Sequence, residues 1–499
     1  MARSSSVERA KERARSTNLP DLLASNWNPL FRQVTIEPQR IFEPLGTEPM
    51  SSVKDFGAAG DGTTDDTQAI RHAIEQGDGL ISFPRGRYYI TSTIEVPLDR
   101  TGYLAFEGSG GTATIVMAGA GPALRLVGTH DRSAQPDSFR PNVWQKQRMP
   151  TVRDLEFTAD HPEADGIELV GTMQGTIEGV LIHKMRHGIR LHRRNRNVLI
   201  NACHLYHNTG VGIYLDSVNL HQINITGNHI SYNRLGGIRI ERSEIRNLQI
   251  TGNDIEYNNH RAHGTEPEPT AEITIDTQAP GATVDEVAIC SNTIQATVSP
   301  GGANLRILDR ASRDRPPGLL TVTGNIIGNQ EVNVHLVGCH GLVLSGNVIY
   351  SCGERSILAE NCDHLNITGS NFRSHDLSPD PKMFTGIRLE KCRDSILSSC
   401  LLSDEIPGGQ PTKAALVELE ECERITIQGC QFLNGTPVGI DAVDCNFTNV
   451  VGCTLTDLRD PQPSEGGIRF RGTSKQNRVS NCIIDDGWNN GVEGASSNG

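Results

Sequence analysis

The sequence predicts an all-β solenoid, a single right-handed parallel β-helix of about 12 coils with an N-terminal arm and a capping helix. Three observations predict this fold. A short strand pattern recurs every 22 to 35 residues, a second position of the same repeat carries Asn and later Cys, and no helical periodicity lies between the repeats. The predicted boundaries are residues 1–50 for the arm and 51–499 for the β-helix.

The composition agrees with a solenoid. A chain of 499 residues would ordinarily form two or three domains, but each repeat of a solenoid buries its apolar side only against its neighbours. Glycine is abundant, with 51 residues, and aromatic residues make up only 5% of the chain. These proportions favour a long, narrow aliphatic core over one large globular core.

The strand pattern consists of Gly or a small polar residue, an aliphatic residue, a variable residue and a second aliphatic residue. Alternation with a period of two indicates a strand with one buried face. The first aliphatic residue of each repeat is the predicted anchor of a buried column, which comprises Ile167, Ile189, Ile213, Ile238, Ile273, Leu305, Val334, Ile357, Ile387, Val417, Ile440 and Ile468. The first and third residues after each anchor then point outward.

The second recurring position carries Asn in five repeats, as Asn228, Asn253, Asn292, Asn325 and Asn347. Asn tolerates left-handed backbone, and its amide can bond the next Asn, so a structural ladder is predicted inside the solenoid. The same slot continues as Cys400, Cys430, Cys453 and Cys482, while Cys339, Cys362, Cys392, Cys422 and Cys445 follow the repeat at a further position. These cysteines are predicted to be buried free thiols rather than disulfides.

The N-terminal region differs from the repeats. Residues 1–50 contain a helical stretch at 7–15 and then chain punctuated by Pro, which predicts an arm or cap. From Thr64 the sequence predicts a short helix that ends near Gly77. The open end of a solenoid needs a cover, and this helix is placed to provide one.

The opening of the repeat region resembles the pectate lyase superfamily. The segment at 53–70 reads VKDFGAAGDGTTDDTQAI, and ISFPRGRYYI follows at 81–90. The resemblance implies a β-helix of the kind found in pectinases, β-1,3-glucanases, alginate epimerases and phage tailspikes. It also implies a structural role for Asp61, Asp65 and Asp66. The Asn-Thr-Asp, Gly-His-Gly and Arg-Ile-Lys signatures of polygalacturonases and the Asp-Pro-His motif of alginate epimerases are missing, so the resemblance carries no subfamily.

Charge and hydropathy exclude two classes of partner. A formal net charge of −13 argues against a general nucleic-acid binder, which needs basic surface to release counterions. No stretch approaches 18 consecutive apolar residues, so no membrane span is expected. Residues 1–15 are polar and basic without an apolar leader, which predicts a cytoplasmic protein and leaves export open.

Three acidic residues stand in consecutive repeats at the third position after the anchor, namely Asp216, Glu241 and Asp276. Coils stack about 4.8 Å apart, so these carboxylates are predicted to repel one another and to raise the pKa of one of them. A carboxyl group with a raised pKa can serve as a general acid. Glu272 precedes an anchor and is a fourth catalytic candidate. Glu360, Glu390 and Glu420 repeat the same position farther along and form a less favoured second cluster.

The predicted substrate-binding residues surround these acids. The strands contribute Arg190, His192, Tyr214, Arg239 and Arg306, and two inserts contribute His260, His263 and Trp144. Arginine can bind the carboxylate of a uronate with two parallel hydrogen bonds. The insert at 259–270, which carries both histidines, and a second excursion at 310–317 are predicted to wall a groove.

The sequence therefore predicts a carbohydrate-active enzyme that cleaves a polysaccharide, and an acidic one is favoured. Hydrolysis is slightly preferred, since it needs two carboxyl groups. The alternatives are a lyase that acts by β-elimination, and a non-catalytic, tailspike-like β-helix that binds glycans. No resident cofactor or metal is predicted, except Ca²⁺ in the case of a lyase. A homotrimer is a further expectation.

Overall fold

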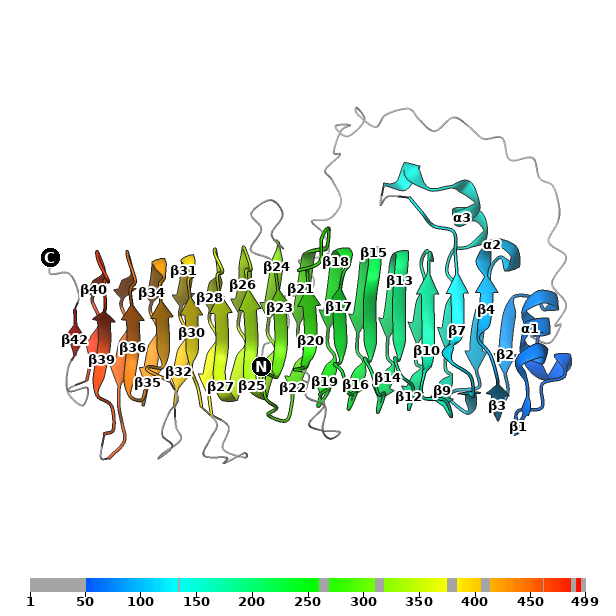
Figure 1. The fold of residues 1–499 in the computed structure, drawn as a ribbon, viewed down its shortest axis with the longest axis horizontal. Helices are drawn as coiled ribbons and strands as arrows, with labels where there is room; N and C mark the ends of the chain where they lie inside the picture. The colour runs from blue at the N-terminus through cyan, green and yellow to red at the C-terminus, as the bar shows by residue number, and fades with distance from the viewer. Residues whose placement is uncertain are drawn as a thin grey trace, which may run out of the picture. The chain divides into compact units, whose positions relative to one another are not determined.

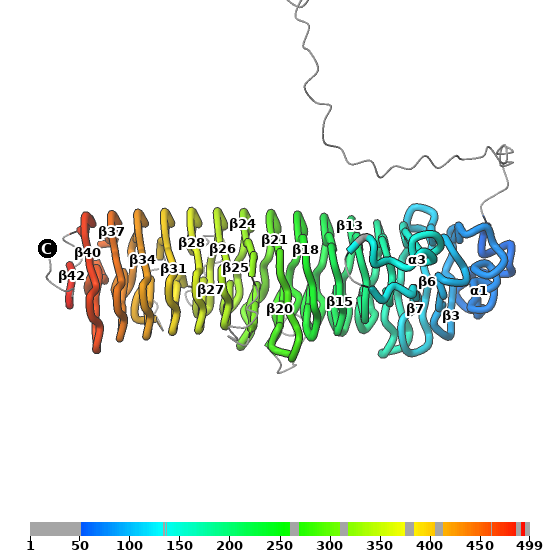
Figure 2. Tube along the Cα trace, turned by 90° about the horizontal axis from the view of Figure 1, so that it is seen from above, coloured from blue at the N-terminus to red at the C-terminus, as the bar shows by residue number. Residues whose placement is uncertain are grey.

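The computed structural model describes residues 51–132, 135–259, 269–309, 318–374, 384–404, 413–460, 462–485 and 491–494. Residues 50–499 form one compact unit, and the predicted arm at 1–50 lies outside the described residues. Strands of successive coils lie beside one another along the length of this unit (Figures 1 and 2). The predicted parallel β-helix is confirmed.

Each coil contributes to three parallel sheets. The anchor sheet holds β4 (Ile94–Pro97), β7 (Gly121–Val127), β10 (Ala164–Val170), β13 (Ile189–Asn201), β15 (Ile213–Thr226), β17 (Ile238–Glu241), β20 (Ala271–Asp276), β23 (Ala303–Leu308), β25 (Ile326–Val337), β27 (Val348–Glu360), β30 (Ile387–Glu390), β33 (Val417–Glu420), β36 (Val438–Val443), β39 (Gly466–Arg471) and β42 (Val492–Glu493). The long strands β13, β15, β25 and β27 bend from one sheet into another.

The other two sheets follow in each coil. The second sheet holds β2 (Leu80–Phe83), β5 (Ala105–Gly108), β8 (Thr151–Arg153), β11 (Thr176–Glu178), β18 (Glu244–Thr251), β21 (Thr283–Cys290), β24 (Leu320–Thr323), β26 (Leu342–Ser345), β28 (Asn366–Thr368), β31 (Arg393–Ser398), β34 (Glu423–Gln428), β37 (Asn449–Val451) and β40 (Arg478–Ser480). The third sheet holds β1 (Asp61–Asp65), β3 (Gly86–Ile90), β6 (Ala113–Met117), β9 (Glu156–Ala159), β12 (Leu181–His183), β14 (His204–Tyr206), β16 (His229–Ser231), β19 (Asp254–Glu256), β22 (Thr293–Gln295), β29 (Asn371–Arg373), β32 (Leu401–Ser403), β35 (Gln431–Leu433), β38 (Thr454–Thr456) and β41 (Ile483–Ile484).

The predicted anchor column is confirmed from Ile167 to Ile468, with every anchor paired to the next in parallel register. The column also continues through Leu124 to Ile94 at one end and to Val492 at the other. All twelve predicted anchors are at most 1% exposed. Stacked aliphatic side chains therefore form the continuous core that a solenoid requires.

The predicted amide ladder is present inside the solenoid. The Nδ2 atom of Asn253 donates to Oδ1 of Asn292 at 3.0 Å, and equivalent bonds of 2.9 to 3.1 Å join the other members of the series. Ser370 lies between the last Asn and the first Cys of the slot, since its hydroxyl accepts from the backbone of Asn347. Every described cysteine is a free thiol, and Cys290 and Cys482 are the half-buried ones.

A second amide ladder occupies the turn between the third sheet and the anchor sheet. Asn208 donates to Asn233 at 2.8 Å, and Asn233 donates to Asn258 at 2.7 Å. Asn258 in turn donates to a carboxylate oxygen of Glu272 at 2.6 Å. All four side chains are buried, so this ladder helps to fix the register of β15, β17 and β20.

The N-terminal end carries the short helices. The predicted capping helix is α1 (Thr67–Gln76), which buries Ile70 and Ala73 beside η1 (Val53–Phe56). Farther along lie α2 (Leu98–Thr101), η2 (Pro136–Ser138) and α3 (Pro141–Lys146), and α3 packs near α2 (Figure 1).

Candidate functional site

The outer face of the anchor sheet brings the predicted site residues into two neighbouring columns. The first column pairs Arg190 with Tyr214 and Tyr214 with Arg239. The third-position column pairs His192 with Asp216, Asp216 with Glu241, and Glu241 with Asp276. The prediction that consecutive coils place these side chains side by side is therefore confirmed.

A hollow of about 400 Å³ lies on this face, over β4, β7, β10 and β13. Its lining includes the charged side chains of Glu95, Arg125, Glu168, Arg190 and Arg193, together with His192, Val127 and Val170. The three arginines outnumber the two glutamates. This part of the surface is therefore locally basic on a chain whose formal net charge is −13.

A chain of ion pairs runs along the floor of the hollow. Arg125 contacts Glu168 at 2.5 Å, and Glu168 contacts Arg190 at 3.3 Å. Arg190 then reaches Asp216 at 2.6 Å. The carboxylates are nearly covered, since the side chains of Glu168 and Asp216 are 6% and 10% exposed. Each buried carboxylate is thus neutralised by an arginine, as burial of charge requires.

Arg242 extends this chain to the next coil. Its Nη2 atom donates to Asp216 at 2.7 Å, to Glu241 at 2.8 Å and to the hydroxyl of Tyr214 at 2.9 Å. Arg239 approaches the other oxygen of Glu241 at 3.1 Å, and the Tyr214 hydroxyl donates to Glu241 as well. The guanidinium of Arg242 therefore bridges the carboxylates of Asp216 and Glu241, and the Tyr214 hydroxyl contacts both Arg242 and Glu241.

This arrangement overturns the expectation of a raised carboxyl pKa. Burial by itself would raise the pKa of Asp216, but hydrogen bonds from Arg190 and Arg242 outweigh burial and lower it below its ordinary value. Burial opposes the same outcome at Glu241, where Tyr214 and the two arginines lower the pKa. Both acids are ionised at neutral pH, so neither one holds a proton to donate.

His192 has the geometry of a base at the edge of the hollow. Its Nδ1 atom lies 2.9 Å from the backbone carbonyl oxygen of Asp216, and a carbonyl oxygen only accepts hydrogen bonds. Nδ1 therefore carries the proton in the neutral ring, which leaves a lone pair on Nε2. No described residue hydrogen-bonds Nε2.

Arg193 follows His192 and supplies a cation with no counter-charge. It lines the hollow and is exposed, and among the described residues no carboxylate forms an ion pair with it. Its backbone is left-handed, with φ of 60°, at the turn between the anchor sheet and the second sheet. The Nε atom of Arg190 is also buried without a partner in the described structure. Because the Nε atom of Arg190 is buried, the exposed guanidinium of Arg193 is the group available to an anionic ligand.

Glu272, the fourth predicted catalytic residue, does not lie on the outer face with the other three. The side chain is wholly buried, and both its oxygens accept hydrogen bonds from the backbone amide of Asn258, at 2.8 and 3.0 Å. The residue before an anchor in this coil points inward, because it meets the turn that closes the second amide ladder. Its carboxyl group therefore accepts hydrogen bonds inside the solenoid and does not face the solvent.

Two other predicted residues lie on the sheet but outside the ion-pair chain. Asp276 is half-buried and accepts a hydrogen bond from the backbone of Gln278 at 2.8 Å, which makes a local turn. Among the described residues, no cation forms an ion pair with Asp276, whereas Glu241 is paired with Arg239 and Arg242. Arg306 lies 3.3 Å from His335 and donates to the carbonyl of Gly301. The predicted cluster thus ends at Glu241.

None of the predicted insert residues lines the hollow in the part of the chain that the structure describes. His260 and His263, and the excursion at 310–317, lie outside the described residues. Trp144 lies on α3, where it is 49% exposed and its ring centroid is 6.4 Å from that of Phe139. It does not line the hollow. The predicted insert at 130–150, which carries Trp144, nevertheless follows β7, whose last residue, Val127, lines the hollow.

The second acidic run is also paired with cations. Glu360 contacts His335 at 2.9 Å, and Arg388 contacts both Glu390 at 3.5 Å and Glu420 at 2.5 Å. Hydrogen bonds from Lys391, together with that neighbouring arginine, lower the pKa of Glu390.

A second cavity of about 500 Å³ lies over the second sheet and differs in character. Amide side chains line it, including Gln174, Asn197, Gln222 and Asn247, beside the exposed Leu199. It holds no charged residue. It therefore offers no attraction for an acidic ligand, in contrast to the hollow.

Reasoning from the sequence missed Arg193, Arg242 and the acceptor role of Glu168. Arg193 and Arg242 immediately follow the third-position residues His192 and Glu241, at the left-handed turn that ends the anchor strand. The sequence did contain a signal for these two arginines, because both occupy the same position of the repeat, one residue after the outward third position. The period-two alternation of a strand does not predict the direction of a side chain at that position, since the chain turns there.

The family model for the right-handed beta helix region matches residues 143–286 and 317–499, which together make up more than half of the chain. The chain belongs to this family of right-handed β-helix proteins. A second model, described as rhamnogalacturonase A/epimerase, pectate lyase-like, matches residues 50–135. That segment contains the opening motif, so the predicted resemblance to pectate lyase-like proteins is confirmed.

Individual relatives match in part. A probable glucan endo-1,3-beta-glucosidase of Arthroderma benhamiae is 45% identical over 58 residues, which cover 11% of this chain and 7% of that protein. Mannuronan C5-epimerase AlgE6 of Azotobacter vinelandii is 30% identical over 185 residues, which cover 33% of this chain and 20% of that protein. The chain thus spans at most a fifth of these two curated relatives.

Comparison with solved structures gives partial superpositions at low sequence identity. The Dettilon tailspike protein superposes with a TM-score of 0.49 at 14% identity, covering 70% of this chain and 67% of that one. No helix among the described residues is long and apolar enough to cross a membrane.

Proposed function

We propose that this protein binds an acidic polysaccharide along the outer face of the anchor sheet and cleaves it by β-elimination, with His192 as the base. The observation that carries the proposal is the pairing of His192, whose Nε2 is unpartnered, with the uncompensated cation of Arg193 in one hollow. Two relatives whose names refer to glucan and mannuronan support a polysaccharide as the ligand.

The chemistry follows from what each side chain supplies. The guanidinium of Arg193 binds the carboxylate of a uronate residue, and neutralising that carboxylate makes the adjacent C5 proton more acidic. His192 Nε2 takes this proton, the C–H electron pair forms the C4–C5 double bond, and the C4–O bond to the neighbouring sugar breaks. The departing oxygen takes a proton from solvent. The backbone carbonyl of Asp216 holds the imidazole in the required tautomer.

Hydrolysis fits the same face less well. A glycosidase needs one protonated carboxyl group and one ionised carboxylate near the scissile bond. Both Asp216 and Glu241 have lowered pKa values and are covered by arginines, so neither one is a proton donor at neutral pH. The slight preference for hydrolysis that the sequence suggested is therefore replaced by a preference for elimination.

The test is an assay of the purified chain against polyuronates and neutral glucans. Elimination creates an unsaturated product that absorbs in the ultraviolet, whereas hydrolysis creates reducing ends without that absorbance. We expect unsaturated product from a polyuronate, and at least a hundredfold loss of rate in His192→Gln, in keeping with removal of a general base. His229→Gln is the matched control, because His229 is an exposed histidine paired with Asp254 in the third sheet. Reducing ends alone, or equal activity in both variants, would contradict the proposal.

Assembly as a homotrimer remains a prediction. Sedimentation of the full chain checks it, and a monomer would mean that the described face binds its ligand without a neighbour's help.

A further inference from the structure

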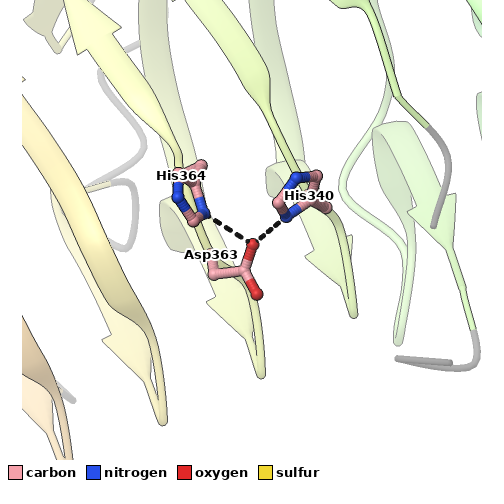
Figure 3. A group of neighbouring side chains, drawn as sticks. All are labelled: His340, Asp363 and His364. Carbon is pink, nitrogen blue, oxygen red and sulfur yellow. Dashed lines mark hydrogen bonds and ion pairs between the residues drawn. The ribbon is translucent and has the colours of Figure 1, made fainter. Parts of the chain in front are cut away.

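A cluster of two histidines and one aspartate lies on the second sheet, outside the site described above. It consists of His340, which lies two residues before β26, and of Asp363 and His364, which lie shortly before β28. The two imidazole nitrogens and one carboxylate oxygen all lie within 4.8 Å of one another. Both rings point toward the carboxylate of Asp363 (Figure 3).

The repeat itself brings these three residues together. Cys339 and Cys362 are stacked, buried members of one cysteine column, and each is followed by a residue of the cluster. His340 therefore pairs in parallel with Asp363 of the next coil. His364 adopts a left-handed conformation, with φ of 54°, at the turn that leads into β28. The positions are thus set by buried neighbours rather than by the exposed side chains.

The hydrogen bonds within the cluster converge on one carboxylate oxygen. The Nδ1 atoms of His340 and His364 both approach the same oxygen, Oδ1 of Asp363, the latter at 3.0 Å. Arg393 donates to the other oxygen, Oδ2, at 2.9 Å and so orients the carboxylate. In these hydrogen bonds both Nδ1 atoms carry the proton, because a carboxylate oxygen only accepts. When each ring moves its proton to Nε2, each Nδ1 has a lone pair, and the two nitrogens can share a cation with the same carboxylate oxygen.

We propose that His340, Asp363 and His364 bind a divalent transition-metal ion of the zinc class, which links two adjacent coils. Two imidazole nitrogens and one carboxylate oxygen suit Zn²⁺, Co²⁺ or Ni²⁺, whereas Ca²⁺ and Mg²⁺ prefer oxygen ligands only. Zinc lies about 2.0 to 2.2 Å from nitrogen and oxygen ligands, so atoms that share it lie about 3.4 Å apart. The present separations require only small rotations of the side chains.

The site is open to solvent. The side chains of His340 and His364 are 42% and 58% exposed, while that of Asp363 is 17% exposed. Three protein ligands leave at least one coordination position for water or for another ligand. The proposal extends the sequence analysis, which predicted no metal other than Ca²⁺, and it does not depend on the proposed polysaccharide chemistry.

The test measures binding of Zn²⁺ and Co²⁺ to the metal-free full chain by calorimetry and by visible absorption of bound Co²⁺. We expect binding at the described cluster, and a higher melting temperature when Zn²⁺ is present, because the ion binds only the folded arrangement. Asp363→Asn and the double variant His340→Gln/His364→Gln should each weaken this binding by more than about tenfold, since loss even of an outer partner costs roughly 10- to 100-fold.

The matched control is the double variant His204→Gln/His229→Gln. These two histidines are also stacked between adjacent coils, with ring centroids 5.2 Å apart, and His229 contacts Asp254 at 3.0 Å. They do not converge on one carboxylate oxygen, so their replacement should leave the affinity unchanged. Metal-free variants should melt as the parent does, which shows that they fold. The absence of binding by the parent, or equal affinity in parent and Asp363→Asn, would overturn the proposal and leave the cluster as a set of hydrogen bonds.

Discussion

Glu272 accepts a 2.6 Å hydrogen bond from the side-chain amide of Asn258, and both side chains are buried inside the solenoid. A carboxyl group thus ends a row of stacked amides. Burial raises the pKa of Glu272 to about 8, although the hydrogen bonds from Asn258 oppose that shift. The protein therefore contains an internal group that gains or loses a proton near neutral pH.

Replacing this acid should remove part of the pH dependence of stability. A folded pKa above the unfolded value means that the stabilisation by Glu272 is complete below its ordinary pKa and is lost as pH rises through about 8. Between those limits the parent should lose about 1.4 kcal/mol per pH unit from this group. In Glu272→Gln the amide keeps the acceptor for Asn258 and has no charge to bury, so that loss should disappear.

Urea unfolding of both proteins between pH 5 and pH 9 checks this expectation. The difference between parent and variant isolates Glu272 from the other groups that titrate in the same range. A difference that stays constant with pH would show that Glu272 does not change its protonation there.

Arg242 should make the fold more resistant to unfolding by acid. Its guanidinium binds both Asp216 and Glu241, whose lowered pKa values stabilise the fold above their ordinary pKa and cease to do so as pH falls through the folded value. In Arg242→Met these pKa values should rise toward normal, and acid unfolding should begin at a higher pH. The loss at neutral pH should be only about 1 kcal/mol, because the guanidinium is 49% exposed and solvent screens it.

Circular dichroism during acid titration measures the shift. Arg424→Met is the control, since Arg424 is similarly exposed at 45% but binds Asp394, whose side chain is 31% exposed rather than nearly covered. An equal shift in both variants would mean that burial of the carboxylates does not matter.

The amide ladder should be costly to interrupt. Asn292 accepts from the backbone and side chain of Asn253 and donates to Asn325, all within the core. Asn292→Ala leaves these buried groups without partners, and we expect a loss of about 3 kcal/mol in the free energy of unfolding. Asn292→Ser should lose less, because a serine hydroxyl accepts from Asn347 in the equivalent slot at Ser370. Urea midpoints measure both, and equal losses would contradict a hydrogen-bonding role.

The fold could be predicted from the sequence because one physical rule acts in every coil. A buried aliphatic anchor must stack on the next, so the spacing of Ile167, Ile189 and Ile213 fixed the register of the whole sheet. The same register placed Asp216 beside Glu241 without any knowledge of the structure. Stacked amides and thiols followed for the same reason.

The state of the site could not be predicted in that way. Spacing places two carboxylates in one column, but it does not show which cations reach them from the turns, as Arg242 does. A raised pKa was expected at one of Asp216, Glu241 and Asp276. Raised carboxyl pKa values occur instead at Glu272, whose side chain points inward at the turn before β20, and at Glu256 on the third sheet. The backbone conformation at the turns therefore determines which cations reach the carboxylates and which way Glu272 points. Alternation along the strands does not predict either property.

The most direct test of the proposed binding face is a crystal structure of His192→Gln soaked with a uronic acid oligosaccharide. We predict the sugar along β10, β13 and β15, with one carboxylate within hydrogen-bond distance of Arg193. A sugar bound in the amide-lined cavity around Asn197 and Gln222, or beside Glu390 on the later coils, would contradict the assignment of the hollow as the binding site.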